Sequence, residues 1–375
     1  MTEQKWSPET WAVYDLGWLE EIWLKLQVRS VCSYFQTWGW IGTWLSCIPA
    51  EQRPAVLSIS RNGDVVGLCA LGTNRVKRRL ASSRSLFINE SGMPSYDRVT
   101  MEHNGILAER EDETSVIGVA LKYLTDTRQD WEEIFLSGVD DGLVATYQNA
   151  ALACGLRARV ASVTPFYIVD LDKIRRSQQH YLGHLSANTR YQIRRSKRAY
   201  LEQGEVHVRA ATDLREAQAF LDDLKRLHQS YWERRAEVGA FGTEFSWRFH
   251  QTLVETRFPH AEIQLLRIAA GDTLIGYMYN FLHNGVVYNY QTGFVYPPDD
   301  SRMKPGLLSH AEAIEYNLIA GLRTYDLLMG NHRYKTSLST DTESMSWLRV
   351  QRPKLKFHLE DAVYSLRDRV RRLRS

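Results

Sequence analysis

The stretch that decides the fold is GDTLIGYMYNFLHNGVVYNYQTGF, residues 271–294, followed after a polar loop by KPGLLSHAEAIEYNLIAGLRTYDLLMGNHRYK, residues 304–335. The first part is typical of two antiparallel strands. In the second part, apolar residues recur at three- and four-residue spacing, which predicts a helix that Pro305 and Gly306 open and Gly321 stops. A short strand over residues 325–329 follows. This part of the chain is therefore predicted to be an α/β domain.

The start of this predicted helix is a candidate anion site. Backbone N–H groups are free in the first turn of any helix, and the helix dipole places partial positive charge there. Such an end can hold a diphosphate. The alternative is that the unit is an ordinary strand, loop, helix and strand whose helix start binds nothing.

Length and composition indicate a globular protein of about two domains, because 375 residues exceed one typical domain. Hydrophobic residues make up 44% and charged residues 24% of the chain, as in ordinary soluble domains. The formal net charge of +3 is too small to indicate a nucleic-acid partner by itself.

The four cysteines, Cys32, Cys47, Cys69 and Cys154, include no CxxC pair and have no histidine at zinc-ligand spacing. We therefore expect reduced thiols and no metal. The N-terminal residues lack the basic start and apolar run of a secretory signal, and no stretch approaches the roughly twenty apolar residues of a membrane span. We expect a cytoplasmic protein without a transmembrane segment.

Tryptophans are concentrated near the N-terminus, with seven of the chain's 11 in the first 44 residues. One interpretation is that two helices pack their indoles into a core. The other is a surface that docks on a partner or a membrane, since tryptophan suits the water–lipid boundary.

The chain contains a diverged internal repeat. Residues 55–72 and 263–281 both read as a strand, a Gly-Asp turn and a strand, with Gly63-Asp64 matching Gly271-Asp272. No counterpart of the Lys304-Pro305-Gly306 loop is found in the first half. We therefore expect the first half to have lost any ligand site.

A basic segment joins the two halves. Ser186 is a plausible N-cap and Gly204 a stop for a helix over residues 187–201 that carries five arginines and lysines after residue 189. Three interpretations stay open: a solvated linker helix, a patch for a phosphate-bearing acyl donor or acceptor, and a nucleic-acid contact.

An amphipathic helix from Asp213 follows, and its end carries aromatic and cationic residues before a glycine-rich turn. Such residues border a cleft or finish a helix against a core. We take His228, Trp232 and Arg235 as candidate substrate-binding residues.

Several motifs together resemble the GNAT acyltransferase superfamily and, within it, the CelD-like branch named for cellulose biosynthesis. They are FQTWGWIGTW, LSANTRYQIRRSKR, LIGYMYNF, YNYQTGF and RTYDLLMGNHRYK, and they span about residues 33–357. The resemblance implies an α/β fold of tandem GNAT-like domains, each a mixed, largely antiparallel twisted sheet flanked by helices. It also implies four parts: a degenerate domain (1–172), a basic linker helix and connection (173–210), an acyltransferase domain (211–360) and a basic tail (361–375).

The resemblance further implies that acetyl-CoA or another acyl-CoA is the co-substrate, with no metal. In the family, the strand matching residues 287–294 binds the pantetheine arm and the next loop binds the pyrophosphate. The loop here departs from the Arg/Gln-x-x-Gly-x-Gly/Ala pattern, since only Gly306 is a glycine. The cofactor-binding residues implied in this sequence are Tyr290, Thr292, Gly293, Arg302, Lys304, Gly306 and Lys335.

The implied chemistry is attack of a neutral amine on a thioester, which needs an acid for the leaving thiolate and an acceptor for the ammonium proton. Tyr334 is the candidate acid, because the Tyr334-Lys335 pair matches the family's closing motif. The candidate bases are Asp326, His332 and Glu315, in that order, and water is the alternative.

The leading hypothesis is an acyl-CoA-dependent N-acyltransferase that acts on a small-molecule amine, such as an amino sugar or amino acid. Polysaccharide or cell-envelope precursors are suggested by the resemblance alone. A second hypothesis is a Fem-like transferase that uses aminoacyl-tRNA, which the basic helix would bind. A third is a non-catalytic GNAT-fold scaffold or regulator. The sequence does not predict an oligomeric state.

Overall fold

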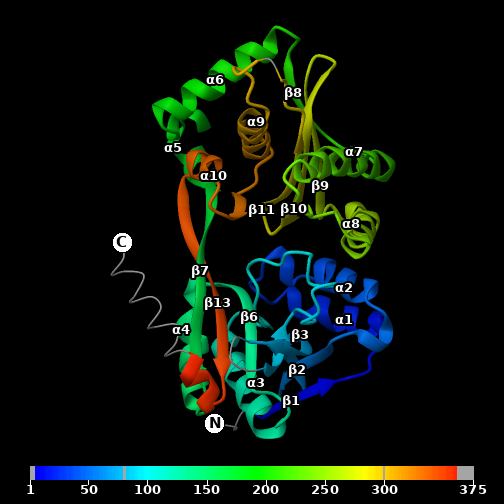
Figure 1. The fold of residues 1–375 in the computed structure, drawn as a ribbon, viewed down its shortest axis with the longest axis vertical. Coiled ribbons are helices and arrows are strands. Elements are labelled where there is room, and N and C mark those ends of the chain that lie inside the picture. Colours follow the sequence, from blue (N-terminus) through cyan, green and yellow to red (C-terminus); the bar gives the residue numbers. More distant parts are fainter. Residues whose placement is uncertain (1–4, 79–81, 299, 361–375) are drawn as a thin grey trace. The chain divides into compact units, whose positions relative to one another are not determined.

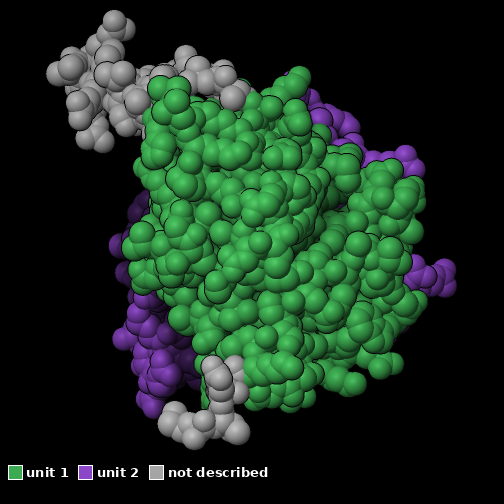
Figure 2. Space-filling view, turned by 90° about the horizontal axis from the view of Figure 1, so that it is seen from below, with its two compact units in different colours: residues 1–163, 345–375 green, residues 164–344 purple. Residues whose placement is uncertain are grey.

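The computed structural model describes residues 5–78, 82–298 and 300–360 (Figure 1). The expected basic tail, residues 361–375, lies outside the described residues. The chain forms two compact units, coloured separately in Figure 2: unit 1 comprises residues 1–163 and 345–375, and unit 2 comprises residues 164–344. Each unit is described by itself.

Unit 1 is a sheet with helices on both faces. Its elements are β1 (Trp6–Trp11), α1 (Leu16–Gln27), α2 (Trp38–Cys47), β2 (Ala55–Arg61), β3 (Asp64–Lys77), β4 (Ser82–Ile88), β5 (Leu107–Ala108), α3 (Glu113–Thr127), β6 (Glu133–Asp140), α4 (Asp141–Ala153) and the later part of β13 (Asp341–Gln351). The strand order is β1-β2-β3-β4-β6-β13. Neighbouring strands are antiparallel except β4 and β6, which are parallel.

The tryptophan-rich start of the chain packs into the interior of unit 1. Trp23, Trp38, Trp40 and Trp44 on α1 and α2 are each at most 3% exposed, whereas Trp18 is 45% exposed. Most of these tryptophans therefore pack into a core, as the first of the two interpretations of the sequence expects.

Unit 2 begins within β7 (Arg157–Asp170). Its further elements are α5 (Leu171–Ser177), α6 (Ala187–Leu201), β8 (Val206–Ala210), α7 (Leu214–Glu233), α8 (Glu244–Arg257), β9 (Ile263–Ala270), β10 (Thr273–His283), β11 (Val286–Phe294), α9 (Pro305–Ile319), β12 (Thr324–Met329) and α10 (Arg333–Leu338). The strand order is β8-β9-β10-β11-β12-β7, with β11 and β12 the parallel pair. In Figure 1, α6 and α9 lie on one face of this sheet, and α7 and α8 on the other.

The helices of unit 2 begin where the sequence predicts. The Ser186 and Asp213 side chains accept hydrogen bonds from the first turns of α6 and α7, and Pro305 is the first residue of α9. Gly321 follows the end of α9 with φ +84°, a value that favours glycine.

The two units repeat one order of elements: a strand, two helices, three strands, a helix, a strand and a helix. The predicted hairpins are β2–β3 and β9–β10, and each register shifts by one residue just before Gly67 or Gly276. The predicted α/β fold, a largely antiparallel sheet flanked by helices in each half, is confirmed. The four-part division at residues 172, 210 and 360 stays a prediction, since compact units need not coincide with family domains.

Among the described residues, no helix combines the length and the apolar character needed to cross a membrane.

Candidate functional site

Two parallel strands of unit 2 part at the end of a short ladder. The pairing of β11 with β12 covers Val286–Tyr288 and Thr324–Asp326, after which β11 continues to Phe294 beside β10 alone. Along its other edge, β12 pairs with β7 from Thr324 to Met329, with a register shift after Asp326. We call the edge of β11 from residue 289 to 294, together with residues 327–329 of β12, the unit 2 wedge. An extended ligand could add to such a strand edge by main-chain hydrogen bonds.

A bulge lies in β11 where the strands part. Asn289 pairs with Asn280 and Gln291 with Tyr279, so Tyr290 is the extra residue in the β11 strand. Tyr290 is buried, and its ring packs against Phe281, with centroids 4.9 Å apart. The sequence-predicted residues Tyr290, Thr292 and Gly293 thus all lie on the unit 2 wedge.

Gly293 is explained by close packing of α7. A Cβ atom at this position would come within 2.8 Å of the Leu224 carbonyl oxygen and 3.0 Å of the Leu227 Cβ. Any larger residue would push α7 away from β11. The contact accounts for the glycine without a ligand, and its predicted cofactor role stays a prediction.

The strand β12 is bent at Leu328, a residue with φ +61°. The Asp326 carboxylate accepts a hydrogen bond from the Leu328 N–H at 2.7 Å, and the Lys335 ammonium donates to the carbonyl oxygens of Leu328, at 3.3 Å, and Met329. Asp326 and Lys335 are both buried. Left-handed backbone costs free energy for a leucine. These two side chains therefore stabilise the bend that directs β12 away from β11.

The first turn of α9 follows the loop after β11. Lys304 is the N-cap residue and donates its backbone N–H to the Ser196 Oγ on α6 at 2.8 Å. Pro305 has no N–H, and Leu308 begins the helical ladder by donating to the Lys304 carbonyl. Within the described part of the chain, the N–H groups of Gly306 and Leu307 have no hydrogen-bond partner. This helix start therefore offers two donors to an anion.

Arg302 and Lys304, the predicted phosphate contacts, differ in their surroundings. The Arg302 guanidinium is bound by the carboxylates of Asp300, at 2.7 Å, and Glu202, at 2.9 Å. These hydrogen bonds and charges raise the pKa of Arg302 and tie the loop to the end of α6. Lys304 is exposed. Lys304 is thus better placed than Arg302 to meet a phosphate.

Tyr334, the candidate acid, lies in a stack of rings. Its ring is stacked on His310, with centroids 4.7 Å apart and planes 22° apart, and on His332, at 6.0 Å and 26°. Burial, followed by the nearby Tyr296 and Tyr231, raises the pKa of Tyr334. The hydroxyl is therefore protonated at neutral pH, as a proton donor must be.

His310 is a member of this site that the sequence analysis missed. It is 2% exposed and its Nδ1 has no hydrogen-bond partner among the described residues. Burial, with a smaller effect of Lys335, lowers its pKa to about 3. The signal was present in the sequence, because His310 is a polar residue within the apolar repeat of Leu307, Ala311 and Ile314.

The three candidate bases do not gather at one place. Asp326 holds the Leu328 N–H inside β12, and exposed His332 is stacked on Tyr334. The Glu315 carboxylate pairs instead with the His180 Nδ1 at 3.0 Å. Glu315 is five positions after His310, about 140° around the helix, and so faces away from the Tyr334 ring. Of the three candidate bases, His332 is the one that contacts Tyr334 and has an exposed side chain.

The predicted substrate-binding residues lie together at the end of α7. The Trp232 Nε1 donates to the His228 Nε2 at 2.9 Å, and the Arg235 guanidinium lies 3.6 Å from the centroid of Tyr231. Tyr231 in turn stacks on Tyr296, which follows β11, at 5.9 Å. His228, Trp232 and Arg235 thus border the segment that leads from the unit 2 wedge to α9.

In unit 1, the matching parallel strands part in the same way, but the chain fills the space between them. The ladder of β4 with β6 ends at Phe87 and Phe135. Asn104 then bridges the strands: its backbone N–H donates to the Gly138 carbonyl at 2.9 Å, and its Nδ2 donates to the Ile88 carbonyl at 2.9 Å. Asn104 is 2% exposed. We call this arrangement the unit 1 plug.

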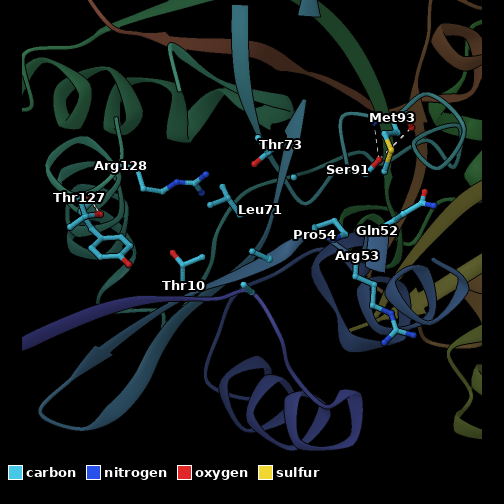
Figure 3. Close-up of a pocket in the computed structure, with 14 residues that line it drawn as sticks. Thr10, Gln52, Arg53, Pro54, Leu71, Thr73, Ser91, Met93, Thr127 and Arg128 are labelled. Carbon is cyan, nitrogen blue, oxygen red and sulfur yellow. Dashed lines mark hydrogen bonds between the residues drawn. The ribbon is translucent and has the colours of Figure 1, made fainter. Parts of the chain in front are cut away.

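Unit 1 also has a hollow of about 480 Å³ near β1, β2 and the end of α3 (Figure 3). Its two cationic side chains are engaged elsewhere: the Arg53 Nε donates to the Leu45 carbonyl at 3.0 Å, and Arg128 pairs with Asp130 at 2.6 Å. No residue predicted from the sequence lines it. Among the described residues of both units, no group of three or more His, Cys, Asp or Glu side chains could hold a metal ion.

Comparison with known families matches residues 187–336 to the acetyltransferase (GNAT) domain. The match runs from the start of α6 into α10 and contains the unit 2 wedge, the start of α9 and Tyr334. It covers less than half of the chain. It supports the general GNAT resemblance, and the CelD-like branch stays a prediction. Comparison with curated protein sequences gives no match.

Several solved structures share the fold over nearly the whole chain. FemX is 10% identical, with a TM-score of 0.57 over 90% of this chain and 96% of that one. The C-terminal domain (DUF2156) of a proposed lysylphosphatidylglycerol synthetase from Agrobacterium fabrum is 11% identical, with a TM-score of 0.55 over 95% and 96%. L-PGS from Bacillus licheniformis is 11% identical, with a TM-score of 0.53 over 89% and 92%. At these identities the likeness shows the fold.

Proposed function

We propose that the chain is an acyl-CoA-dependent N-acyltransferase that transfers an acyl group, in the first instance acetyl, to a primary amine of a small molecule. One observation carries the proposal: the unit 2 wedge leads directly to the start of α9, where the N–H groups of Gly306 and Leu307 are available. An extended arm with a diphosphate at one end would match this geometry. The GNAT domain match over the same residues supports it.

Tyr334 would supply the proton for the leaving group. The amine nitrogen attacks the thioester carbonyl carbon, a C–N bond forms, and the C–S bond breaks as the thiolate leaves. The thiolate takes the Tyr334 hydroxyl proton, which is present at neutral pH because the pKa of Tyr334 is raised. The stacked His310 and His332 hold the phenol ring in position.

His332 is the best placed of the three candidate acceptors for the ammonium proton. Its side chain is exposed and stacks on Tyr334, whereas Asp326 is engaged with Leu328 and Glu315 with His180. A water held by His332 is an equivalent path for the proton. The phenolate left on Tyr334 is then reprotonated from solvent.

The acceptor we propose is an amino sugar, amino acid or related amine. The His228, Trp232 and Arg235 group offers an aromatic surface and an exposed guanidinium, which suits a small polar molecule with a ring or an acidic group. A role in polysaccharide or cell-envelope precursor synthesis would follow from the CelD-like resemblance.

A second candidate is a transferase that takes its acyl group from aminoacyl-tRNA. The observation that favours it is the outer face of α6, where the Arg194 and Arg198 side chains are exposed. The fold likeness to FemX is compatible with it. A non-catalytic scaffold with the same fold is the third reading.

Calorimetric titration with acetyl-CoA tests the proposal, followed by detection of free thiol in the presence of a panel of amino sugars and amino acids. We expect binding at one site and thiol release that depends on the amine. Lys304→Ala should weaken binding about fivefold, because a cation near the diphosphate is lost. Lys122→Ala, the same change on α3, is the matched control. Absence of binding by the wild type to CoA and to acyl-CoA would overturn the proposal.

A further inference from the structure

The second half of the basic helix α6 is joined to α9 and to the loop before it. The Ser196 Oγ accepts the Lys304 N–H at 2.8 Å, the Lys197 Nζ pairs with Glu312 of α9 at 2.7 Å, and Glu202 at the C-cap pairs with Arg302 at 2.9 Å. A helix that served only as a linker would not need three polar contacts to one loop and helix. The start of α9 is therefore built by α6 as well as by its own residues.

A buried hydroxyl without a partner lies at this junction. Tyr200 on α6 is 2% exposed, and its OH has no hydrogen-bond partner among the described residues. Burial, followed by the charges of Asp300 and Tyr296, raises its pKa to about 12. The Tyr296 OH lies 3.9 Å from the position that a Cβ of Gly306 would take. An unpaired buried hydroxyl is costly, so a hydrogen-bond acceptor supplied by a ligand would be favourable there.

Arg195 is the arginine of α6 on the side of this junction. Its charge acts on Asp300, whose pKa is lowered first by hydrogen bonds from Arg302 and also by Arg195. Arg195 is half-buried, whereas Arg194 and Arg198 are exposed. At about 100° per residue, Arg194 and Arg198 lie about 160° around the helix from Ser196, and Arg195 lies at about 100°. The helix therefore has Arg195 on the side of the loop, whereas Arg194 and Arg198 are directed to solvent.

We infer that α6 forms a second wall of the acyl donor's phosphate site, with the Tyr200 hydroxyl and the Arg195 guanidinium binding the diphosphate or 3′-phosphate end that the first turn of α9 holds. The inference rests on the proposed function. It assigns the basic helix to a nucleotide-type acyl donor rather than to a linker or a nucleic acid. Arg302 stays engaged with its two carboxylates and closes the loop.

Calorimetric titration of the full chain with CoA, and with pantetheine as a probe that lacks the phosphates, tests this assignment. Arg195→Gln should weaken CoA binding about tenfold and Tyr200→Phe about fivefold, because each loses a hydrogen bond to a charged group. Pantetheine binding should not change in either variant. Arg198→Gln, the same change on the outer face of α6, should bind CoA as the wild type does.

The outcomes separate the two proposals. If the wild type binds CoA and the Arg195→Gln and Tyr200→Phe variants bind it equally well, the assignment of α6 is wrong and the proposed function stands. Equal losses in Arg195→Gln and Arg198→Gln would also overturn it, because they would show a diffuse charge effect. If the wild type binds no CoA but binds tRNA with a loss in Arg198→Gln, the proposed function itself fails.

Discussion

In both units, one pair of parallel strands separates at the end of a short ladder, but what lies beyond the separation differs. In unit 1, Asn104 spans the space from β4 to β6, with hydrogen bonds to the Ile88 and Gly138 carbonyls. In unit 2, β11 and β12 part after Asp326, and the chain runs from Phe294 through a loop to the start of α9. Under the proposed function, the opening that the chain itself closes in unit 1 is the one that takes the acyl donor in unit 2.

The buried ionisable groups follow the same division. Unit 2 keeps two histidines, His250 and His310, buried and neutral, with the pKa of each lowered to about 3 chiefly by burial. In unit 1, burial followed by the charge of Asp97 raises the pKa of Glu90 to about 7. Glu90 should therefore respond to pH in the opposite direction to the two histidines. Glu132 in unit 1 responds as the histidines do, because the effect of burial is outweighed by hydrogen bonds from Lys354 and Lys356, which lower its pKa to about 2.

Acid should destabilise unit 2 through its two buried histidines, and this is the largest effect we expect. A histidine whose pKa is lowered in the folded state is protonated at a higher pH in the unfolded state than in the folded state. Its contribution to stability is therefore present above pH 6.5 and is lost as pH falls towards 3. Each buried histidine costs about 1.4 kcal/mol per pH unit in that range. At pH 4.5, unit 2 should lose about 5 kcal/mol from His250 and His310 together. Hydrogen exchange of peptides from each unit measures it.

In unit 1, the contribution of Glu90 to stability changes with pH in the opposite direction. Its folded pKa is raised, so its contribution is complete below pH 4.5 and is lost as pH rises through 7, a change of about 3 kcal/mol. Glu90→Gln should flatten this dependence and leave that of unit 2 intact. An unchanged pH dependence of unit 1 in Glu90→Gln would contradict this assignment.

Breaking the unit 1 plug should cost stability and leave donor binding unchanged. Asn104→Leu removes the side-chain hydrogen bonds to Ile88, at 2.9 Å, and Ser137, at 3.2 Å, and the one accepted from the Asn89 Nδ2, at 3.0 Å. We expect a loss of about 3 kcal/mol in the unfolding free energy of unit 1, since buried carbonyl and hydroxyl groups lose their partner. Asn149→Leu, an exposed asparagine on α4, is the control.

Denaturant titration followed by the tryptophans of α1 and α2 reports the stability of unit 1. Calorimetry with acetyl-CoA reports the donor site. Weaker acetyl-CoA binding in Asn104→Leu than in Asn149→Leu would show that the plug serves the donor site, and the comparison of the two openings would then be wrong.

Periodicity and turn chemistry predicted most of the elements that form these openings. Apolar spacing placed α9 from Pro305 onward, and the Gly-Asp turns placed both hairpins. What the sequence could not give was pairing at a distance. Asn104 is an unremarkable polar residue until β4 and β6 are seen to part around it, and Tyr290 becomes a bulge only through its register with β10. Glu315 lies on the predicted helix, but only the contact with His180 shows which face it occupies.

The bend in β12, which Asp326 stabilises, directs this strand away from β11 in the unit 2 wedge. Substitutions of Asp326 can therefore distinguish a structural role from a catalytic one. Asp326→Ala should lose the hydrogen bond to the Leu328 N–H, reduce stability by about 2 kcal/mol and weaken acetyl-CoA binding about tenfold. Asp326→Asn keeps an oxygen acceptor and should recover most of the binding and turnover. A general base would be as inactive with asparagine as with alanine. Such a result would assign Asp326 to proton transfer.

Tyr334→Phe should have the smallest effect, because the ring keeps its stack on His310 and only the hydroxyl is lost. We expect kcat to fall about tenfold, equivalent to about 1.4 kcal/mol, with the acetyl-CoA Kd unchanged. The loss should shrink with thioesters of more acidic thiols, which leave without a proton. Because the pKa of Tyr334 is raised, the wild-type kcat should show no loss from its ionisation below pH 10. An equal loss with every thioester would mean that the hydroxyl positions the substrate instead, and the unit 2 wedge would then need another acid.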